Sequence, residues 1–342
     1  MKSMWGGGTT MTDDIMLSII MPVHNVERYL PRIIEELKRQ ENDAMEVVCI
    51  DDGSTDGSPA VLDAIDDPHF VVIHQANAGV AAARNHGLDV ARGEYLCFID
   101  PDDHISDGYI TALTNAAEAG EADLMVTDWA KCKPDGIEEK RVSGVVDGKP
   151  LTAESVLGIL LHSDVILGSL WAKTYSAKLF EGNRFPAQKT SSDFMPSVTA
   201  ISRAKHVEYI PNIKYMYTAD RSDSLQNSQK AQDIADSVHV HMQFEELLEQ
   251  RYPSLLAAAQ LDLLLARVQA CIHICKSVNI PTSQKKGLYH KYAHGMMHDF
   301  GLVWGSNLPV KEKILFTITA SGYYPTTLIF GLKAKLAALR QK

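Results

Sequence analysis

The sequence predicts an α/β domain built on a largely parallel, buried sheet and followed by a helical C-terminal extension. Three features support this prediction. Short apolar runs alternate with segments of helical periodicity over the first hundred residues, polar turns follow those runs, and the last hundred residues keep only the helical pattern. Such alternation favours βαβ units, whose parallel strands are covered on both faces. The chain has 342 residues, and at roughly 150 residues per domain we expect two domains.

The first part of the chain repeats the order strand, turn and helix. The expected strands are residues 17–21 (LSIIM), 46–50 (EVVCI), 70–73 (FVVI) and 94–99 (EYLCFI). Pro22 is expected to end the first strand, and residues 26–40 and 80–91 carry the periodicity of helices. Ligands of parallel sheets bind beyond the carboxyl ends of the strands, so the turns after these runs are where chemistry is expected.

Composition divides the chain into three parts. Residues 1–15 contain three consecutive glycines and lack the apolar stretch of a secretory signal, so we expect a flexible leader. Residues 16–228 contain the alternating pattern and then an aromatic-rich stretch. Residues 229–342 are expected to be mainly α-helical, with no fixed repeat.

The overall composition excludes several classes of protein. Hydrophobic residues make up 45% and charged residues 22%, which is typical of a globular chain and excludes a disordered or collagen-like one. The 43 acidic and 33 basic side chains give a net charge of −10, which argues against nucleic acid as a partner. Five widely spaced cysteines, an odd number, fit a reducing compartment, so a cytoplasmic location is expected.

Three carboxylates crowd the turn after the fourth expected strand. Asp100 and Asp102 flank Pro101, and Asp103 follows directly. Such crowding is unfavourable without a cation, and carboxylate oxygens suit Mg²⁺ or Mn²⁺. The alternative is that these aspartates cap a helix that opens near Ser106.

The turn after the second expected strand is also polar. Residues 51–58 (DDGSTDGS) combine two glycines with hydroxyls and acids that can bond to local amides or to a ribose and base. The alternative is an ordinary loop between a strand and a helix, and the turn by itself does not decide between them.

The segments SIIMPVHN, IDDGSTDGS and NAGVAAARNHGLDVARGEYLCFIDPDD occur in this order along the chain. Together they closely resemble the nucleotide-sugar-binding half of the family 2 glycosyltransferases of the GT-A fold. The resemblance covers residues 17–103, continues more weakly to about residue 225, and reaches no motif in the last hundred residues. It implies a Rossmann-like nucleotide-binding mixed sheet flanked by helices, and an inverting enzyme of the bacterial polysaccharide-assembly type.

The resemblance also implies which side chains contact the nucleotide sugar. These are Pro22, His24, Asn25, Asp51, Asp52, Asn77, Gly79 and Arg84. Asp52 is expected at the uracil or ribose. The family commonly has tyrosine where this chain has His24, and a histidine can still stack on the base or bond to it. Arg84 is expected near the sugar or diphosphate, and the alternative for it is a surface salt bridge on its helix.

Asp100-Pro101-Asp102 aligns with the DxD signature of the family. The resemblance implies that Asp100 contacts the ribose or sugar and that Asp102 coordinates the metal, Mn²⁺ or Mg²⁺. The physical reason is that negative charge develops on the departing nucleoside diphosphate, and a divalent cation neutralises it.

An inverting transfer also needs a base that takes the proton of the acceptor hydroxyl. The family usually supplies it from a Glu-Asp pair, and the matching place reads Ser191-Ser192-Asp193-Phe194, so Asp193 is the candidate base. The alternative is that Asp193 caps the following helix.

Two further segments complete the implied site. Trp171 and Lys173 resemble the acceptor-side segment, where an aromatic face packs on a sugar, and burial of Trp171 is the alternative. Arg221 and Ser224 resemble a loop that closes over the diphosphate, and a solvated loop is the alternative.

The helical part contains two groups of possible metal ligands, and neither is expected to form a metal site. On a helix, His273 would lie well away from Cys271 and Cys275, so a zinc site is not expected. His290, His294 and His298 would share one helical face, which we expect to be solvated or interfacial because no acidic or cysteine ligand accompanies them.

Residues 314–332 are 19 uncharged residues with lysines on both sides. Gly322 and Pro325 interrupt them, so two shorter amphipathic pieces with basic ends are expected rather than a spanning helix. These pieces would lie on an anionic membrane surface, at the inner face of the cell membrane. The alternative is a helix pair that packs on the catalytic domain or forms a homo-oligomer.

The sequence therefore predicts a metal-dependent glycosyltransferase. It would move a sugar from a nucleoside-diphosphate sugar, expected to be a UDP-sugar, to a glycan or lipid-linked glycan in cell-surface polysaccharide synthesis. One alternative is an inactive nucleotide-sugar-binding scaffold, because the usual glutamate is missing before Asp193. A nucleotidyltransferase is disfavoured, because no glycine-rich basic loop follows the first strand.

Overall fold

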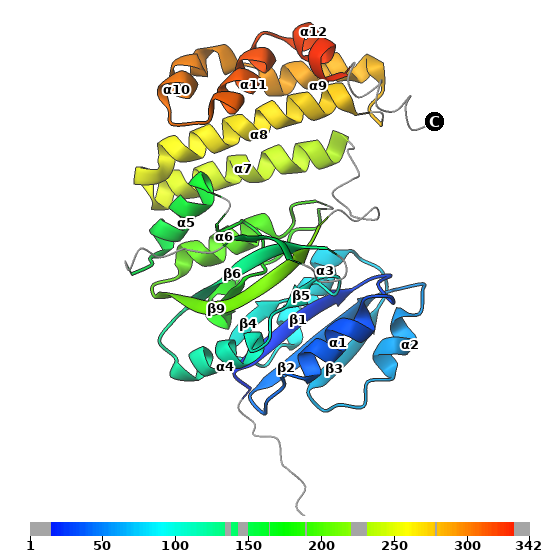
Figure 1. The fold of residues 1–342 in the computed structure, drawn as a ribbon. Helices are drawn as coiled ribbons and strands as arrows, with labels where there is room; N and C mark the ends of the chain where they lie inside the picture. Colours follow the sequence, from blue (N-terminus) through cyan, green and yellow to red (C-terminus); the bar gives the residue numbers. More distant parts are fainter. Residues whose placement is uncertain are drawn as a thin grey trace, which may run out of the picture.

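The computed structural model describes residues 15–133, 138–142, 150–163, 165–188, 190–219, 231–277 and 279–331. The predicted leader, apart from Ile15, and the predicted domain boundary at residues 228 and 229 therefore lie outside the described residues. Within these ranges the chain forms a mixed sheet covered by helices and a helical C-terminal region above it (Figure 1). The predicted fold class, a mixed α/β sheet with a helical extension, is confirmed.

The first half of the sheet is parallel. Its strands are β1 (Leu17–Val23), β2 (Met45–Asp52), β3 (Phe70–Gln75) and β4 (Tyr95–Phe98). The intervening helices are α1 (Leu30–Lys38), α2 (Ser58–Asp63) and α3 (Val80–Val90). Every residue of β1 and β2 is buried, which explains why these strands are mostly apolar, and the buried Ser18 donates a hydrogen bond to Glu46 at 2.6 Å. The predicted alternation of strands and helices is confirmed.

Pro22 does not end β1, contrary to the prediction. The strand keeps its register with β2 as far as Val23 and Asp51, whereas pairing with β4 ends at Ile20 and Phe98. Proline has no N–H to donate. The backbone groups of a strand point alternately to its two neighbours, so the nitrogen of Pro22 faces the side of β4, which has already stopped pairing with β1 at this point. The last residues of β1 therefore have a strand neighbour on one side only, which leaves room at the carboxyl edge of the sheet.

The second half of the sheet mixes directions. It contains β5 (His104–Ile105), β6 (Leu124–Cys132), β7 (Glu138–Val142), β8 (Lys173–Ser176) and β9 (Val207–Thr218). The strand order among the described residues is β3-β2-β1-β4-β8-β6-β9-β5, with β7 paired to β6. β8 runs antiparallel to both β4 and β6, whereas β6 and β9 are parallel. This half brings β9 back toward the end of β4.

Helices cover both faces of the sheet. One face packs on α1 and on α4 (Tyr109–Ala119), where Leu30 and Leu113 are fully buried. The other packs on α5 (Ala153–His162) and α6 (Phe194–Arg203), and Phe98 contacts an aromatic cluster there. Phe244 from α7 (Ala231–Arg251) is fully buried in the same core. The C-terminal region is therefore joined to the sheet by apolar packing.

The C-terminal region is almost wholly helical, as predicted. Its further helices are α8 (Leu256–Lys276), α9 (Thr282–Ala293), α10 (Phe300–Gly305), α11 (Val310–Ala320) and α12 (Tyr323–Thr326). Short 3₁₀ turns cover Ala177–Phe180, Pro253–Leu255 and Met296–Asp299, and a π-helical turn covers Thr327–Gly331.

α8 lies at the centre of this region. Together with the turn before it, Pro253–Lys276 is long and apolar enough to cross a membrane by length and composition. In the structure α8 lies between α7 and the later helices, and Val268, Cys271 and Ile274 are at most 1% exposed (Figure 1). One face of α8 therefore belongs to the core of the C-terminal region, while 33% of the apolar stretch as a whole is buried.

The ends of α9 and α11 test two predictions, on the three histidines and on the apolar stretch of residues 314–332. α9 ends at Ala293 and Gly295 takes a left-handed φ of +79°, a common way for a helix to stop. His294 and His298 therefore leave the helix that carries His290, and the prediction that the three share one helical face is wrong. α11 ends at Ala320 and Gly322 has a φ of +120°, so the predicted break of the apolar stretch is confirmed.

The cysteines and the suggested zinc ligands are also placed. All five cysteines are free and buried. Cys271 and Cys275 face the core of the C-terminal region, whereas His273 is exposed, so the three do not converge on one point.

Candidate functional site

The turns after β1 and β2 are joined through Asn25. Its side-chain oxygen accepts a hydrogen bond from the N–H of Thr55 at 2.7 Å, and its own N–H donates to Ser54 Oγ at 3.0 Å. Asn25 has a φ of +53°, a left-handed conformation that asparagine adopts more readily than most residues. The turn after Pro22, which is itself buried, is therefore fixed in place by the second turn.

His24 is an exposed ring between two turns. Its Nδ1 lies 2.9 Å from the carbonyl oxygen of Asp52, so this nitrogen carries the proton and donates. Its Nε2 lies 3.3 Å from the side-chain amide of Asn77, which is also exposed. The predicted nucleotide-side residues His24, Asn25 and Asn77 are thus brought together at the carboxyl edge of the sheet.

Asp52 holds the loop that carries Asn77. Its carboxylate accepts hydrogen bonds from the N–H groups of Ala78 and Gly79, at 2.8 and 2.7 Å, and the side chain is almost fully buried. The loop passes so close to Gly53 that a Cβ there would lie 2.7 Å from the nitrogen of Asn77, and Gly53 has a φ of +65°. Only glycine fits this approach without strain.

Asp51 is engaged by other groups. Its carboxylate accepts from the N–H of Ser54 at 3.0 Å and pairs with His74 Nδ1 at 2.8 Å. Burial alone would raise the pKa of Asp51, but the hydrogen bonds from Ser54 and His74 outweigh it and lower that pKa. The hydrogen bond to Asp51, helped by Asp63, raises the pKa of His74. Asp51 therefore lies beneath the site and orients the second turn.

Arg84 connects α3 to the turn after β4. Its Nη2 lies 3.1 Å from Asp100 Oδ1, and only 9% of its side chain is exposed. Its Nε is buried and has no hydrogen-bond partner among the described residues, and its guanidinium lies 5.9 Å from the ring of Phe185. The alternative of a surface salt bridge on its own helix is therefore wrong.

Asp103 does not join the other two carboxylates. It is 1% exposed, accepts a hydrogen bond from Tyr215 Oη at 2.7 Å and another from the N–H of Thr218 at 2.7 Å. Burial, and then the charges of Asp102 and Asp100, raise its pKa well above the usual value. The prediction of a third carboxylate at the metal is wrong, because Asp103 is used to attach the turn to β9.

The carboxylates do not cap a helix either. α4 begins at Tyr109, and its N-cap residue is Gly108, with no side-chain cap. The capping interpretation of Asp100 and Asp102 therefore has no support in this structure.

The turn after β4 is also held by residues of α1, which the sequence did not suggest as part of the site. Arg32 Nη1 donates to the carbonyl oxygen of Asp103 at 2.8 Å. Glu36 pairs with His104 Nδ1 at 2.9 Å and accepts from the N–H of Ile105 at 3.2 Å. Burial would raise the pKa of Glu36, but these hydrogen bonds lower it. The sequence shows that Arg32 and Glu36 have i,i+4 spacing, but it does not show that they contact the turn after β4.

An aromatic group adjoins the carboxylate turn. The half-buried ring of Trp171 is stacked on Tyr215 and Tyr217, with centroids 5.2 and 5.5 Å apart and interplanar angles of 7° and 12°. Trp129 packs edge-on against it at 5.4 Å. Because Tyr215 also bonds to Asp103, the predicted acceptor-side tryptophan is connected through Tyr215 to the turn that carries Asp102.

Lys173 follows Trp171 but points inward. It is 2% exposed, and its ammonium donates to the carbonyl oxygen of Ser169 at 2.8 Å. Burial lowers the pKa of Lys173 to about 7, against an opposing effect of the Asp193 charge. Ala172 between Trp171 and Lys173 has a φ of +57°, a strained value for a residue with a Cβ.

Asp193 lies at the start of α6 and is partly exposed. Its side chain makes no capping hydrogen bond, so the capping interpretation is not what the structure shows. Ser191, two residues before, has a φ of +55°. The charge of Asp193 acts on Lys173, the first residue of β8, which lies near the carboxyl end of β4.

The donor set of the turn fits a hard divalent cation. Asp100 has one third of its side chain exposed and pairs with Arg84 through Oδ1, and Asp102 is also partly exposed. Two carboxylates, with a diphosphate and waters completing the shell, are what Mg²⁺ or Mn²⁺ takes in such sites. Arg221 and Ser224, the predicted residues of the closing loop, lie outside the described residues.

A second acidic cluster is unrelated to this edge. Glu41, Asp67 and His69 have ligand atoms within 4.8 Å of one another, but they lie before β3 rather than after it. Lys38 Nζ is 3.5 Å from Asp67 and offsets the acidic charge. We therefore interpret this cluster as a surface ion-pair group.

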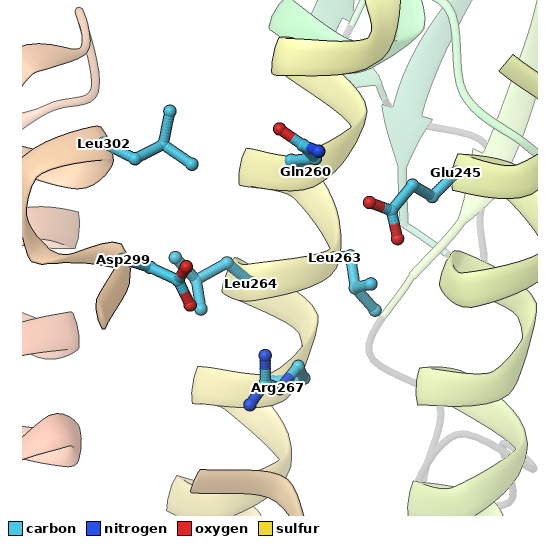
Figure 2. Close-up of a pocket in the computed structure, with 7 residues that line it drawn as sticks. All are labelled: Glu245, Gln260, Leu263, Leu264, Arg267, Asp299 and Leu302. Atoms are coloured by element: carbon cyan, nitrogen blue, oxygen red, sulfur yellow. The ribbon is translucent and has the colours of Figure 1, made fainter. Parts of the chain in front are cut away.

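The C-terminal region contains a hollow of about 300 Å³ between α7, α8 and α10 (Figure 2). Its lining includes Glu245, Gln260, Arg267 and Asp299. Arg267 is committed to the backbone, because it donates to the carbonyl oxygen of Tyr292 at 2.9 Å. None of the predicted site residues lines this hollow, so it is separate from the carboxylate turn.

The sequence matches the family model "Glycosyl transferase family 2" over residues 18–207. The chain is 31% identical to the putative glycosyltransferase EpsH of Bacillus subtilis, over 63% of this chain and 64% of EpsH. It is 26% identical to the uncharacterized glycosyltransferase EpsJ of the same organism, over 82% and 85% of the two chains. The match thus spans just under two thirds of the length of EpsH.

Two solved structures share the fold. Residues 1–349 of Staphylococcus aureus TarS superpose with a TM-score of 0.60 at 17% identity, over 90% of this chain and 91% of that fragment. The mannosyltransferase PcManGT of Pyrobaculum calidifontis superposes with a TM-score of 0.53 at 14% identity, over 97% and 91%. A crystal structure of the same TarS fragment contains UDP-GlcNAc, and the PcManGT structure is a complex with GDP-Man and Mn²⁺.

Proposed function

Because this chain belongs to glycosyl transferase family 2, we propose that it moves a sugar from a nucleoside-diphosphate sugar to an acceptor hydroxyl with inversion. The observation that carries the proposal is the arrangement at the carboxyl edge of the sheet. Arg84, the carboxylate turn and the Trp171 stack lie around that one edge, and the charge of Asp193 acts on Lys173 at the start of β8, although these residues come from distant parts of the chain. The nucleotide sugars bound by TarS and PcManGT support this class of donor.

The nucleotide would lie against the exposed turn residues His24, Asn25 and Asn77. Their ring and amides can stack on a base and exchange hydrogen bonds with it and its ribose. Asp51 and Asp52 would contribute chiefly by fixing the turns, because their carboxylates already accept several hydrogen bonds. We propose UDP as the nucleotide, in line with the resemblance to the family.

The diphosphate would lie between Arg84 and the carboxylate turn. Arg84 can offer N–H groups in a fixed orientation, because its guanidinium is buried and paired with Asp100. Mg²⁺ or Mn²⁺ held by Asp102 would supply the positive charge that offsets the charge developing on the diphosphate. Arg221 and Ser224 are proposed to add contacts from their loop.

The acceptor would enter on the side of Trp171 and Asp193. A sugar ring can pack on the exposed part of the indole, and Asp193 would take the proton of the attacking hydroxyl. Lys173 lies beneath this segment and would support it through the Ser169 carbonyl and through its charge. We propose a glycan or lipid-linked glycan of a bacterial cell surface as the acceptor.

A thermal-shift series tests donor binding. The protein is heated with UDP, GDP and several UDP-sugars, with and without Mn²⁺, because a ligand that binds only the native state raises the melting temperature. A shift with UDP that grows in Mn²⁺ is expected. No shift with any nucleotide or nucleotide sugar would contradict the proposal.

A transfer assay separates an enzyme from a binding scaffold. Radiolabelled sugar nucleotides are incubated with lipid and glycan extracts, and labelled product is expected to depend on Asp193. Nucleotide binding without any product would favour the inactive scaffold, a reading motivated by Ser192 standing where the family has glutamate.

A further inference from the structure

The outermost helices of the C-terminal region expose many large apolar side chains. Of the ten such side chains exposed by the described residues, nine lie between residues 297 and 329. They are Met297, Phe300, Leu302, Trp304, Val310, Ile314, Tyr324, Leu328 and Ile329. Single exposed apolar residues are ordinary, but a concentration of this kind marks an interaction surface.

Eight of these nine side chains belong to one continuous layer, and Met297 lies in the turn that precedes it. Trp304 Nε1 donates to Thr317 Oγ1 at 3.2 Å, which joins α10 to α11. Thr326 Oγ1 donates to the carbonyl oxygen of Ile318 at 3.2 Å, which joins α12 to α11. The layer lies on the far side of α8 from the sheet (Figure 1). We call α10, α11, α12 and the turn Thr327–Gly331 the outer layer.

The charge of the chain is unevenly distributed. Residues 263–342 carry eleven lysines and arginines and only two acidic residues, which leaves a net charge of −19 on the first 262 residues. Most of this positive excess lies on α8, on α9 and in residues 333–342, whereas the outer layer itself carries only Lys311 and Lys313 against Glu312. Such an asymmetry points to an anionic partner.

Lysines and aromatic rings are interleaved around the outer layer. Lys286 Nζ lies 5.3 Å from the centroid of Tyr324, and Lys276 Nζ lies 5.5 Å from that of Phe330. Lysine stems beside aromatic rings are typical of residues at a membrane interface, where rings enter the headgroup layer and ammonium groups meet anionic headgroups.

We propose that the outer layer docks on the surface of an anionic lipid bilayer. A second copy of the chain fits less well, because a symmetric contact would bring the lysines that surround the layer close to those of the other copy. The acidic remainder of the chain would be repelled by the same bilayer, which orients the molecule with its outer layer toward the lipid. This docking goes beyond the proposed transfer reaction, and it would bring the enzyme to a lipid-linked acceptor at the inner face of the membrane.

Cosedimentation with vesicles tests the proposal on the full-length protein. Vesicles of phosphatidylcholine with 30% phosphatidylglycerol are compared with pure phosphatidylcholine, at low and at high salt. Binding to the anionic vesicles only, weakened by salt, is expected, since each lysine near such a surface is worth about a fivefold change in binding.

Two pairs of variants provide the matched comparison. Lys286→Glu with Lys311→Glu is expected to lower binding more than about tenfold. Lys178→Glu with Lys205→Glu makes the same change of net charge on exposed residues of the sheet domain and is expected to leave binding nearly unchanged. Val310→Ser with Leu328→Ser tests the apolar contribution and is also expected to weaken binding.

Several results would overturn the proposal. Equal binding to neutral vesicles, no binding to anionic ones, or equal loss in both charge-reversal pairs would each do so. A dimer in sedimentation velocity that dissociates in the Val310→Ser and Leu328→Ser variant would show that a second copy covers the layer. Thermal shifts with UDP and Mn²⁺ are expected to be the same in all variants, so failure here is distinct from failure of the proposed transfer.

Discussion

Arg84 Nη2 lies 3.1 Å from Asp100 Oδ1 and forms an ion pair between the helix after β3 and the turn after β4. The pair fixes a buried guanidinium beside the turn that carries Asp102. Arginine in such a position presents N–H groups to a diphosphate without further ordering, which lysine cannot do in the same geometry.

Arg84→Lys is therefore expected to lower the rate of sugar transfer by about a hundredfold, the size of a lost charge-assisted hydrogen bond in a buried site. The control is Arg184→Lys, because Arg184 pairs with Asp89 where both side chains are at least half exposed. Steady-state transfer assays of the two variants make the comparison. Similar losses in both would contradict the role given to Arg84.

Asp193→Asn is expected to lower the turnover number by 10² to 10⁴, because the amide cannot accept the proton of the acceptor hydroxyl. Donor binding is expected to be unchanged, since the role proposed for Asp193 concerns the acceptor hydroxyl only. Turnover is measured with radiolabelled donor, and the thermal shift with UDP and Mn²⁺ serves as the internal control. If the variant lost turnover and the thermal shift with UDP and Mn²⁺ to the same extent, Asp193 would have a structural role instead.

The stability of the protein is expected to rise with pH above neutrality because of Lys173. Burial sets its pKa at about 7, below the value in the unfolded chain, so between these values the unfolded state binds the proton more tightly. The free energy of unfolding therefore increases from about pH 7 toward pH 10. Urea titrations at pH 7 and pH 9 are compared for the wild type and Lys173→Met. An equal pH dependence in both would rule out this assignment.

Tyr215→Phe is expected to destabilise the protein by about 1 to 3 kcal/mol. The change keeps the stack with Trp171 but removes the hydroxyl that donates to Asp103 and accepts from the N–H of Asp100. Tyr324→Phe, at a side chain that is 69% exposed, is the control and should alter the free energy by less than about 0.5 kcal/mol. Equal denaturant midpoints for the wild type and Tyr215→Phe would contradict this role.

The parallel half of the sheet could be predicted from local sequence. Fully buried parallel strands read as short apolar runs, and each polar turn follows its own strand directly. That is why Asn25, Asp52 and Asp100 could be placed at one edge before the structure was known. The prediction that Pro22 ends β1 was wrong, because a proline can lie within a strand where the neighbouring strand on its side has stopped pairing, and the sequence does not show where that happens.

The contacts that organise the site could not be predicted in the same way. Asp103 was grouped with Asp100 and Asp102 because the three are adjacent in sequence, whereas its partners Tyr215 and Thr218 lie more than a hundred residues away. β6, β8 and β9 pair in mixed directions over long separations, and no local pattern specifies such a register.

The most direct test of a metal-assisted diphosphate site at the carboxylate turn is calorimetric titration of UDP with and without Mn²⁺. We compare the wild type with Asp102→Asn. Mn²⁺ is expected to tighten UDP binding at least tenfold in the wild type and to have no effect in the variant, whose melting temperature should be unchanged. Equal tightening by Mn²⁺ in both proteins would contradict the assignment of Asp102 as the metal ligand.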